Sequence, residues 1–443
     1  MVWGVQKPKT FFILLGWGSL VLTVVMLYFP YETKLWKSRN ITMETWIKTT
    51  NFDNNETVST SSAWKDNWKQ VTNNIYVYSA FWDDRNKPLK SFIRIIAIGP
   101  RLGDEHENVS CSIYSQNSKS FIELPITYEM IRDNHSKNYS AMYLFCHLSS
   151  GEPTPREVVL RQAPIPLELV KLPIHQGETQ NSTKIQDKLA VCVRPFFGPF
   201  KNTFALAEFV ALYQILGVSH FTFYNYKTSK QVKEFVSSLQ DQGLPVELIL
   251  WNLPKSVAQK TWAFGQMAST QDCIYRHMFV SKYVALVDID EYIVPRNHRT
   301  LLEMIKSLKN NTWGSLVFRN SFFCTKHPVD LKHSKPNLPF TTLRYLTRVK
   351  YVSRAYFRSK SIVQPNRVVT GGIHFVWQHF DNWQPFVVPP SECLLHHYRS
   401  SICSEASYKS GVEDKTVLKF KDKLLKSKVI KIWKTLKKRN VVT

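Results

Sequence analysis

Two aspartates separated by one residue directly follow an apolar run, where their carboxylates could bind a divalent cation. The run Tyr283 to Val287 is followed by Asp288, Ile289, Asp290 and Glu291. Because side chains two apart on a strand face the same side, Asp288 and Asp290 are expected to project in one direction. Mg²⁺ and Mn²⁺ bind carboxylate oxygens and usually keep substrate phosphate oxygens in their shell. The spacing predicts a site for a metal and a diphosphate; a solvated turn is the alternative.

The elements that would position these acids follow an alternating order. Residues 189–195, 220–225, 245–251 and 282–295 read as strands, and residues 203–216, 229–240 and 262–280 read as helices. This alternation predicts a parallel sheet with helices on both faces and ligands at the carboxyl ends of the strands. The glycine-rich phosphate loops of dinucleotide dehydrogenases and P-loop NTPases are missing from the sequence, which argues against both classes.

The region before this alternation has the two-residue periodicity of strands. Residues 71–162 are expected to form a small β-rich module, and residues 163–187 a linker. Cys111 and Cys146 lie in strand-like segments of this module, and we expect a disulfide between them. The chain has seven cysteines and no C-x-x-C pair, so a zinc ribbon is not indicated.

The first part of the chain indicates a membrane anchor. Residues 11–29 carry no charge and nearly span a bilayer as a helix, which leaves residues 1–10 as a cytoplasmic tail and residues 30–70 as a stem. A cleaved signal peptide is the alternative, but no small-residue cleavage site follows the run. All seven N-x-[ST] sequons lie beyond the span, as expected for a single-pass type II protein with a luminal body.

The composition sets further bounds on function. A chain of 443 residues with 44% hydrophobic residues is neither disordered nor a small disulfide scaffold. Its net charge of +24 is typical of proteins that bind nucleic acid or anionic membranes, but the expected luminal topology argues against nucleic acid. Eleven basic residues within 415–439 alternate with apolar residues at helical spacing, and we expect a helix there that packs on the preceding domain.

Five ordered motifs make the chain resemble glycosyltransferase family 92. They are CVRPFFG, AEFVALYQILGVSHFTFYN, GQMASTQDCIYR, VALVDIDEYIVP and LLHHYR, spread over about residues 189–400. The resemblance implies a GT-A fold for residues 188–443 and a metal-dependent, inverting galactosyltransferase of the Golgi membrane. It further implies UDP-galactose as donor, Mn²⁺ as cofactor and a galactose or fucose of a glycoprotein N-glycan as acceptor, joined by a β1,4 linkage.

The resemblance also assigns residues. The family's acidic pair falls on Asp288 and Asp290, and its nucleotide-side residues fall on Arg194, Gln266 and Asp272. Asn225 closes the second strand, where many GT-A enzymes have an aspartate that contacts the nucleotide. The family's H-Y-R motif makes His397 the candidate third metal ligand; a packed histidine is the alternative.

An inverting enzyme also needs a base for the acceptor hydroxyl. After the glycines Gly371 and Gly372, the matched segment contains two acids, Asp381 and Glu392, and the aromatic surroundings of Asp381 favour it. Trp377 and Trp383 could stack on sugars or pack in the core.

Two functional classes therefore stay open. One is a galactosyltransferase, and the other is a non-catalytic luminal protein that keeps the fold and binds glycans or a partner. The intact pair of Asp288 and Asp290 favours the enzyme. Nothing in the sequence predicts the oligomeric state.

Overall fold

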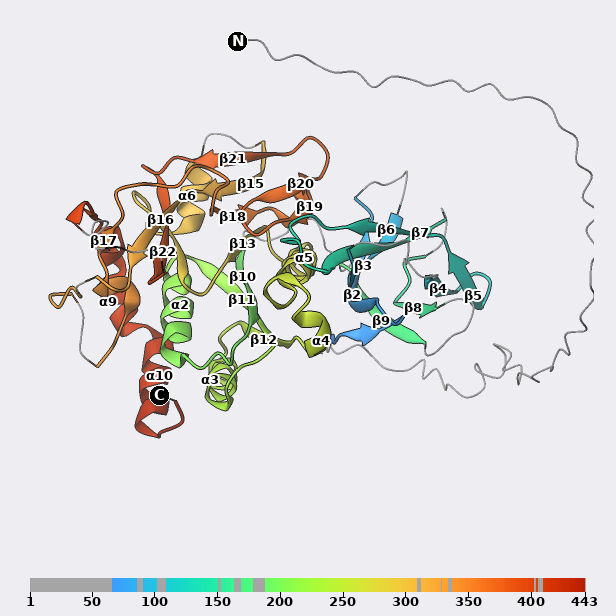
Figure 1. The fold of residues 1–443 in the computed structure, drawn as a ribbon, viewed down its shortest axis with the longest axis horizontal. Helices are drawn as coiled ribbons and strands as arrows, with labels where there is room; N and C mark the ends of the chain where they lie inside the picture. The colour runs from blue at the N-terminus through green and yellow to red at the C-terminus, as the bar shows by residue number, and fades with distance from the viewer. Residues whose placement is uncertain are drawn as a thin grey trace, which may run out of the picture. The chain divides into compact units, whose positions relative to one another are not determined.

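The fold is described from a computed structural model of the chain. The structure describes residues 66–85, 91–101, 109–149, 153–162, 169–177, 188–308, 312–327, 329–333, 337–401, 404 and 409–442 (Figure 1). The predicted tail and anchor, and most of the predicted stem, lie outside these residues. Within the described ranges, no helix is both long and apolar enough to cross a bilayer.

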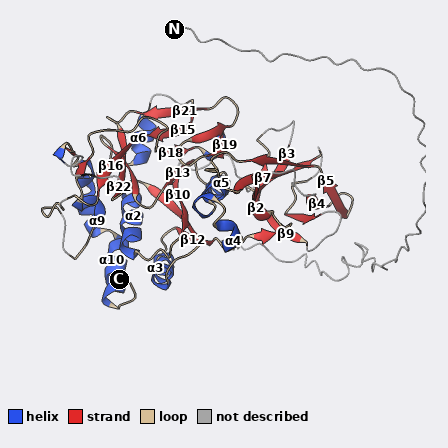
Figure 2. Cartoon of the chain, in the orientation of Figure 1, coloured by secondary structure: helices blue, strands red, loops and turns tan. Residues whose placement is uncertain are grey.

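The first region, here called the β-rich module (residues 66–177), is built from strands and loops in its described part (Figure 2). Its nine described strands are β1 (Lys69–Gln70), β2 (Tyr76–Asp83), β3 (Ser91–Pro100), β4 (Val109–Ser115), β5 (Ser120–Leu124), β6 (Ile126–Met130), β7 (Tyr139–Leu148), β8 (Glu157–Gln162) and β9 (Val170–His175). They pair in the order β5-β4-β8-β9-β2-β3-β7-β6, with β1 on β2. The predicted disulfide between Cys111 and Cys146 is present and joins β4 to β7.

The module is longer than the sequence predicted. Strand β9 pairs with β8 and with β2, so Val170–His175 belongs to the sheet and the expected linker at 163–187 is wrong for these residues. Prolines in this segment suggested a break in structure. Pro173, however, lies in β9 opposite Glu157. Its side chain is exposed, whereas its neighbours Leu172 and Ile174 are buried, so the proline is tolerated within the strand.

The second region, here called the α/β domain (residues 188–442), contains the predicted parallel strands. β10 (Leu189–Phe196), β11 (Val218–Asn225), β12 (Val246–Leu250) and β13 (Tyr283–Val287) are mutually parallel. The sheet continues through β18 (Lys360–Val363), β15 (Trp313–Phe318) and β21 (Gln384–Val388), in the order β12-β11-β10-β13-β18-β15-β21. β18 runs antiparallel to both of its neighbours, so the sheet is mixed.

Two predicted helices form nearly where expected, because polar side chains cap their first turns. α2 (Thr203–Ile215) begins after Asn202, whose side chain accepts the amide of Ala205. α3 (Lys230–Asp241) begins after Ser229, which caps Val232 in the same way.

The helix expected over 262–280 is divided in two. A short 3₁₀ turn, η1 (Trp262–Phe264), is followed by Gly265 at φ +85° and then by α5 (Gln266–His277). The left-handed conformation of Gly265 ends the first turn and starts the second helix in a new direction. The short helix α4 (Lys255–Ala258) precedes this break.

A second sheet and a hairpin complete the α/β domain. The sheet has the order β14-β22-β16-β17-β23 and consists of β14 (Glu291–Pro295), β16 (Asn320–Cys324), β17 (Thr347–Arg348), β22 (Cys393–Arg399) and β23 (Val412–Glu413). The hairpin pairs β19 (Val368–Gly371) with β20 (Val376–His379). The connecting helices are α6 (Leu301–Ser307), α7 (Thr341–Arg344), η2 (Pro365–Arg367) and η3 (Thr416–Phe420).

The basic C-terminal segment packs on the domain, as predicted. It forms α9 (Lys421–Lys426) and α10 (Lys428–Lys438), which lie beside α2 in Figure 1. Trp433 is buried on α10 and its indole N–H donates to Thr203 Oγ1 at 3.1 Å. The apolar side of α10 therefore covers the core, while the lysines of this helix face outward.

Candidate functional site

The acidic motif lies in a turn between two sheets. β13 ends at Val287 and β14 begins at Glu291, so Asp288 and Asp290 are not on one strand and the predicted continuous strand over 282–295 is wrong. β13 belongs to the mixed parallel sheet and β14 to the second sheet. The two carboxylates are therefore placed by different neighbours rather than by strand alternation.

Asp288 faces two cations. Its Oδ2 lies 3.0 Å from Lys360 Nζ and its Oδ1 lies 3.1 Å from Arg194 Nε. Burial alone would raise the pKa of Asp288, but the charges of Lys360 and Arg194 overcome it and hold the pKa at about 2. Asp288 is thus ionised at neutral pH and paired with residues from β18 and β10.

Glu291 and Lys360 are buried beneath the acidic turn and form the floor of the site. Lys360 Nζ lies 3.2 Å from Glu291 Oε2, and that same oxygen accepts the amide of Asp288 at 2.9 Å. Burial would lower the pKa of Lys360, but Asp288 and Glu291 raise it, so the amine stays charged. Sequence reasoning gave Glu291 no role although it lies in the motif VALVDIDEYIVP, and it missed Lys360, which follows Asp288 by 72 positions and belongs to none of the matched motifs.

Asp290 lies on the exposed side of the turn, next to His397. Strands β14 and β22 pair Glu291 with His397. This register brings His397 Nε2 to 3.4 Å from Asp290 Oδ2, and His397 Nδ1 to 3.4 Å from Glu291 Oε1. The Asp290 side chain is 41% exposed, whereas His397 is 8% exposed.

The predicted metal ligands are partly assembled. Asp290 and His397 present an oxygen and a nitrogen to the same space. Glu291 Oε1 lies 3.4 Å from the other ring nitrogen, Nδ1, which makes no hydrogen bond within the described residues. Asp288 lies in the same turn, although its oxygens face Lys360 and Arg194. The donor set is one that Mn²⁺ accepts, so these residues fit the metal that the fold family implies.

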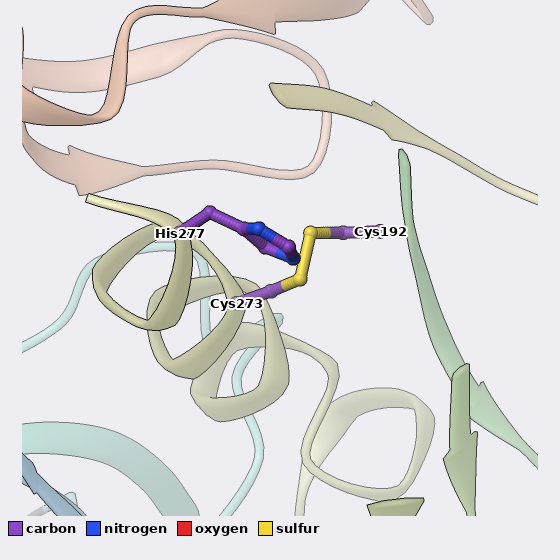
Figure 3. Close-up of side chains that lie close together, drawn as sticks. All are labelled: Cys192, Cys273 and His277. Carbon is purple, nitrogen blue, oxygen red and sulfur yellow. A yellow bond between two sulfur atoms is a disulfide. The ribbon is translucent and has the colours of Figure 1, made fainter. Parts of the chain in front are cut away.

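A second group of side chains that could bind a metal lies in the described ranges, but two of its members form a disulfide. Cys192, Cys273 and His277 have ligand atoms within 4.8 Å of one another (Figure 3). The two sulfurs are bonded to each other, and His277 contacts Thr222 Oγ1 at 3.0 Å. This group therefore joins β10 to α5 and is not a metal site.

A pocket lies at the carboxyl ends of β10 and β13, here called the strand-end pocket. Residues that line it include Arg194, Gln266, Asp288, Lys360, Gly372 and Ile373. Two predicted nucleotide-side residues, Arg194 and Gln266, are thus brought together with Asp288, predicted for both metal and nucleotide binding. The free volume is about 20 Å³, room for about one water, and the ion pair of Arg194 with Asp288 is part of its lining.

Two other predicted nucleotide contacts are not among the residues that line this pocket. Asn225 is half-buried, and its Oδ1 accepts the Thr228 hydroxyl at 2.8 Å. Asp272 is fully buried; its carboxylate accepts bonds from Ser79, Tyr224 and Arg276. Asp272 is therefore a structural anchor between the module and α5, and protein donors satisfy its carboxylate.

The predicted base Glu392 is remote from the metal ligands. It precedes β22 and its carbonyl accepts the amide of Arg296, beyond the far end of β14. At about 3.3 Å per residue, the five positions between Glu392 and His397 correspond to about 16 Å along the strand. Glu392 cannot reach an acceptor sugar at the strand-end pocket.

The predicted base Asp381 is also at the wrong edge. In the β19–β20 hairpin, Val368 pairs with His379, whereas Gly372, which lines the pocket, lies at the opposite end. Asp381 follows His379 in an exposed turn, at φ +50°. The position of Asp381 therefore disfavours it as the base, and that position depends on the pairing of the hairpin, which the local sequence does not specify.

Comparisons with known proteins identify the family of the chain. The sequence profile of glycosyltransferase family 92 matches residues 187–439. Beta-1,4-galactosyltransferase galt-1 of Caenorhabditis elegans is 24% identical over 359 residues, which cover 78% of this chain and 77% of that protein. The crystal structure of HddC from Yersinia pseudotuberculosis covers 47% of this chain and 93% of its own at 9% identity; its TM-score of 0.25 carries no argument. Because the family match covers more than half of the chain, this protein belongs to glycosyltransferase family 92.

Proposed function

We propose that the protein is a metal-dependent, inverting β-1,4-galactosyltransferase with a GT-A α/β domain. It would move galactose from UDP-galactose to a galactose or fucose of a glycoprotein N-glycan. The observation that carries the proposal is the acidic turn Asp288–Asp290 beside His397, next to a pocket at the carboxyl ends of parallel strands. The galactose donor is supported by the name of the nematode relative.

Asp290 and His397 would hold the divalent metal, with Asp288 completing the set. A bound Mn²⁺ supplies positive charge that stabilises the leaving diphosphate. The contribution of the chain is to fix Asp290 and His397 on adjacent elements, 3.4 Å apart, through the pairing of β14 with β22.

Arg194 is placed to bind the diphosphate. Its guanidinium is 34% exposed and lies over the ring of Phe197 at 5.1 Å. A nucleotide does not fit in about 20 Å³, so its entry would require lining side chains to move, and Arg194, the partly exposed one, could turn from Asp288. The planar guanidinium can then pair with phosphate oxygens in the same bidentate way that it pairs with carboxylates.

Asp133 of the β-rich module is our proposed base, since Asp381 and Glu392 lie at other edges. Asp133 Oδ2 accepts the amide of Ile373, which lines the strand-end pocket, at 3.3 Å. Its side chain is 18% exposed, and its Oδ1 lies 3.1 Å from His135 Nε2, a partner that an acceptor hydroxyl would have to replace. Sequence reasoning missed Asp133 because it lies outside the family motifs.

We also propose that residues 11–29 anchor the protein in the Golgi membrane as a single-pass type II protein, with the described domains in the lumen. The charge-free segment and the sequons beyond it support this orientation.

The test uses the full-length protein in detergent with a panel of UDP-sugars. UDP release should require UDP-galactose, Mn²⁺ and an N-glycan that carries galactose or fucose; EDTA should abolish it and added Mn²⁺ restore it. If no UDP-sugar supports release while the protein still binds these glycans, the non-catalytic glycan-binding function replaces the enzyme.

A further inference from the structure

A second cavity lies where the β-rich module meets the β19–β20 hairpin. Its free volume is about 260 Å³, more than ten times that of the strand-end pocket. The module supplies consecutive residues 129–132, and the hairpin supplies Thr370, Trp377 and Gln378. We call it the junction cavity, because neither region forms it alone.

The junction cavity adjoins the strand-end pocket through both segments that line it. On the hairpin, Gly372 lines the strand-end pocket, and a Cβ atom on Gly372 would lie 2.7 Å from the indole of Trp377. On the module, Asp133 directly follows the lining residues 129–132 and accepts the amide of Ile373 from the strand-end pocket. Each segment therefore passes from one cavity to the other within a few residues.

The lining has the chemistry of a saccharide site. Trp377 is 37% exposed and follows Phe375 and Tyr356 in a row of rings whose centroids are 4.6 and 5.6 Å apart. Exposed aromatic faces suit the C–H face of a pyranose, and the side chains of Glu129, Arg132 and Gln378 offer donors and acceptors for its hydroxyls. The volume is below the roughly 300–1,000 Å³ of drug-sized pockets, which suits one sugar unit.

We propose that the junction cavity binds a hexose unit of the acceptor glycan, stacked on Trp377, so that the β-rich module supplies part of the acceptor site. This rests on the proposed function, because an acceptor has meaning only for a transferase. The hexose next to it would then place its hydroxyl between Asp133 and the donor sugar.

The experiment separates acceptor binding from donor binding in the full-length protein. Trp377→Ala should raise the acceptor KM at least about tenfold, with the KM for UDP-galactose and the Kd for UDP unchanged. Glu129→Ala, on the module, should raise the acceptor KM in the same way. Trp383→Ala is the matched control: this ring is covered by Arg367 at 3.3 Å and lies beyond Asp381, away from both cavities, so the acceptor KM should not change.

Direct binding of N-acetyllactosamine and of a fucosylated N-glycan core, measured by saturation-transfer NMR without donor, completes the test. Loss of this signal in Trp377→Ala, with wild-type thermal unfolding, supports the junction cavity. Unchanged acceptor KM and unchanged glycan binding in both Trp377→Ala and Glu129→Ala would overturn it. So would a preference of the cavity for the unglycosylated acceptor peptide. Failure of the wild type to bind UDP or release it from any donor would instead reject the proposed function.

Discussion

At the scale of single residues, Lys360 is the charge around which the acidic turn is arranged. Its amine is 3% exposed and lies between Asp288 and Glu291, at 3.0 and 3.2 Å. A buried and a half-buried carboxylate so close together repel each other unless a cation separates them. Lys360 therefore keeps the turn in place while Asp290, on the outer side, stays available.

Replacing Lys360 with methionine should destabilise the protein strongly. The variant keeps the length of the side chain but leaves Asp288 and Glu291 without their shared cation. We expect the free energy of unfolding to fall by about 3 kcal/mol, as measured by denaturant unfolding. Lys415→Met is the control, because its pair with Glu413 is more than half exposed and should contribute less than about 0.5 kcal/mol. Equal losses in the two variants would contradict a buried role for Lys360.

Asp290 should be needed for turnover but not for folding. Asp290→Asn keeps the size of an exposed side chain and removes one anionic ligand. We expect turnover to fall at least about 10²-fold with thermal unfolding unchanged. Asp381→Asn, on the remote turn, should transfer galactose at the wild-type rate. If the effects of the two variants were reversed, Asp381 would have to be reinstated as the base.

At the scale of elements, the local signals in the sequence were sufficient for some parts and not for others. The ends of α2 and α3 were predictable, because capping residues and glycines act within a few positions. The apolar sequence of residues 282–295 gave no sign that the chain passes from one sheet to another there. The reason is that every residue of β13 and of β14 is buried, so the two strands have the same burial pattern. Arg194, Gln266 and Asp288 were predictable because strand ends and family motifs locate them. The positions of Asp381 and Glu392 depend on long-range strand pairing, which local sequence does not specify, and Asp133, our proposed base, belongs to the other region.

Gly265 determines where α5 begins, and therefore where Gln266 lies. Gly265→Ala should lower the free energy of unfolding by about 1–2 kcal/mol, because a side chain is strained at φ +85°. The added Cβ would also lie 3.2 Å from Ile98, so the start of α5 should shift and UDP should bind more weakly. Gly243→Ala has a similar φ of +73° with no neighbour within 4 Å. It should lose stability to a similar extent, but isothermal titration should find its UDP affinity unchanged; weaker UDP binding there as well would argue against a specific role of Gly265.

At the scale of the whole described structure, buried charges join the module to the α/β domain. Asp83 of β2 binds Arg94 at 2.9 Å and Arg85 at 2.7 Å, and Arg85 donates to the carbonyl of Val368 at the start of the hairpin. Burial alone would raise the pKa of Asp83, but the two guanidiniums lower it to about 2. The folded protein therefore holds this acid ionised well below its ordinary pKa of 3.8.

This shift predicts a stability that depends on pH. Because the folded pKa is below the unfolded one, the contribution of Asp83 is fully present above about pH 5 and is lost as the pH falls through 3.8 toward 2. Its size at neutral pH is about 2 kcal/mol. Asp83→Asn should therefore be less stable than wild type at pH 7, and the gap should narrow in acid, as followed by denaturant unfolding. Asp241→Asn, an exposed change on α3, should follow the wild-type curve; a gap for Asp83→Asn that stays constant with pH would contradict the ion pairs.

The anchoring of Asp272 has a consequence for how such a protein can evolve. Its carboxylate is satisfied from both sides, by Ser79 of the module and by Tyr224 and Arg276 of the α/β domain. A recombination event that exchanged residues 66–177 for another β-rich unit would leave this buried acid short of a donor, at a cost of about 1–3 kcal/mol. We therefore expect the two regions to be inherited together. Substitutions at position 79 should be accepted only with a compensating change at position 272. The acceptor specificity of related proteins should change through point mutations in the contact between the module and the α/β domain, rather than by exchange of whole domains.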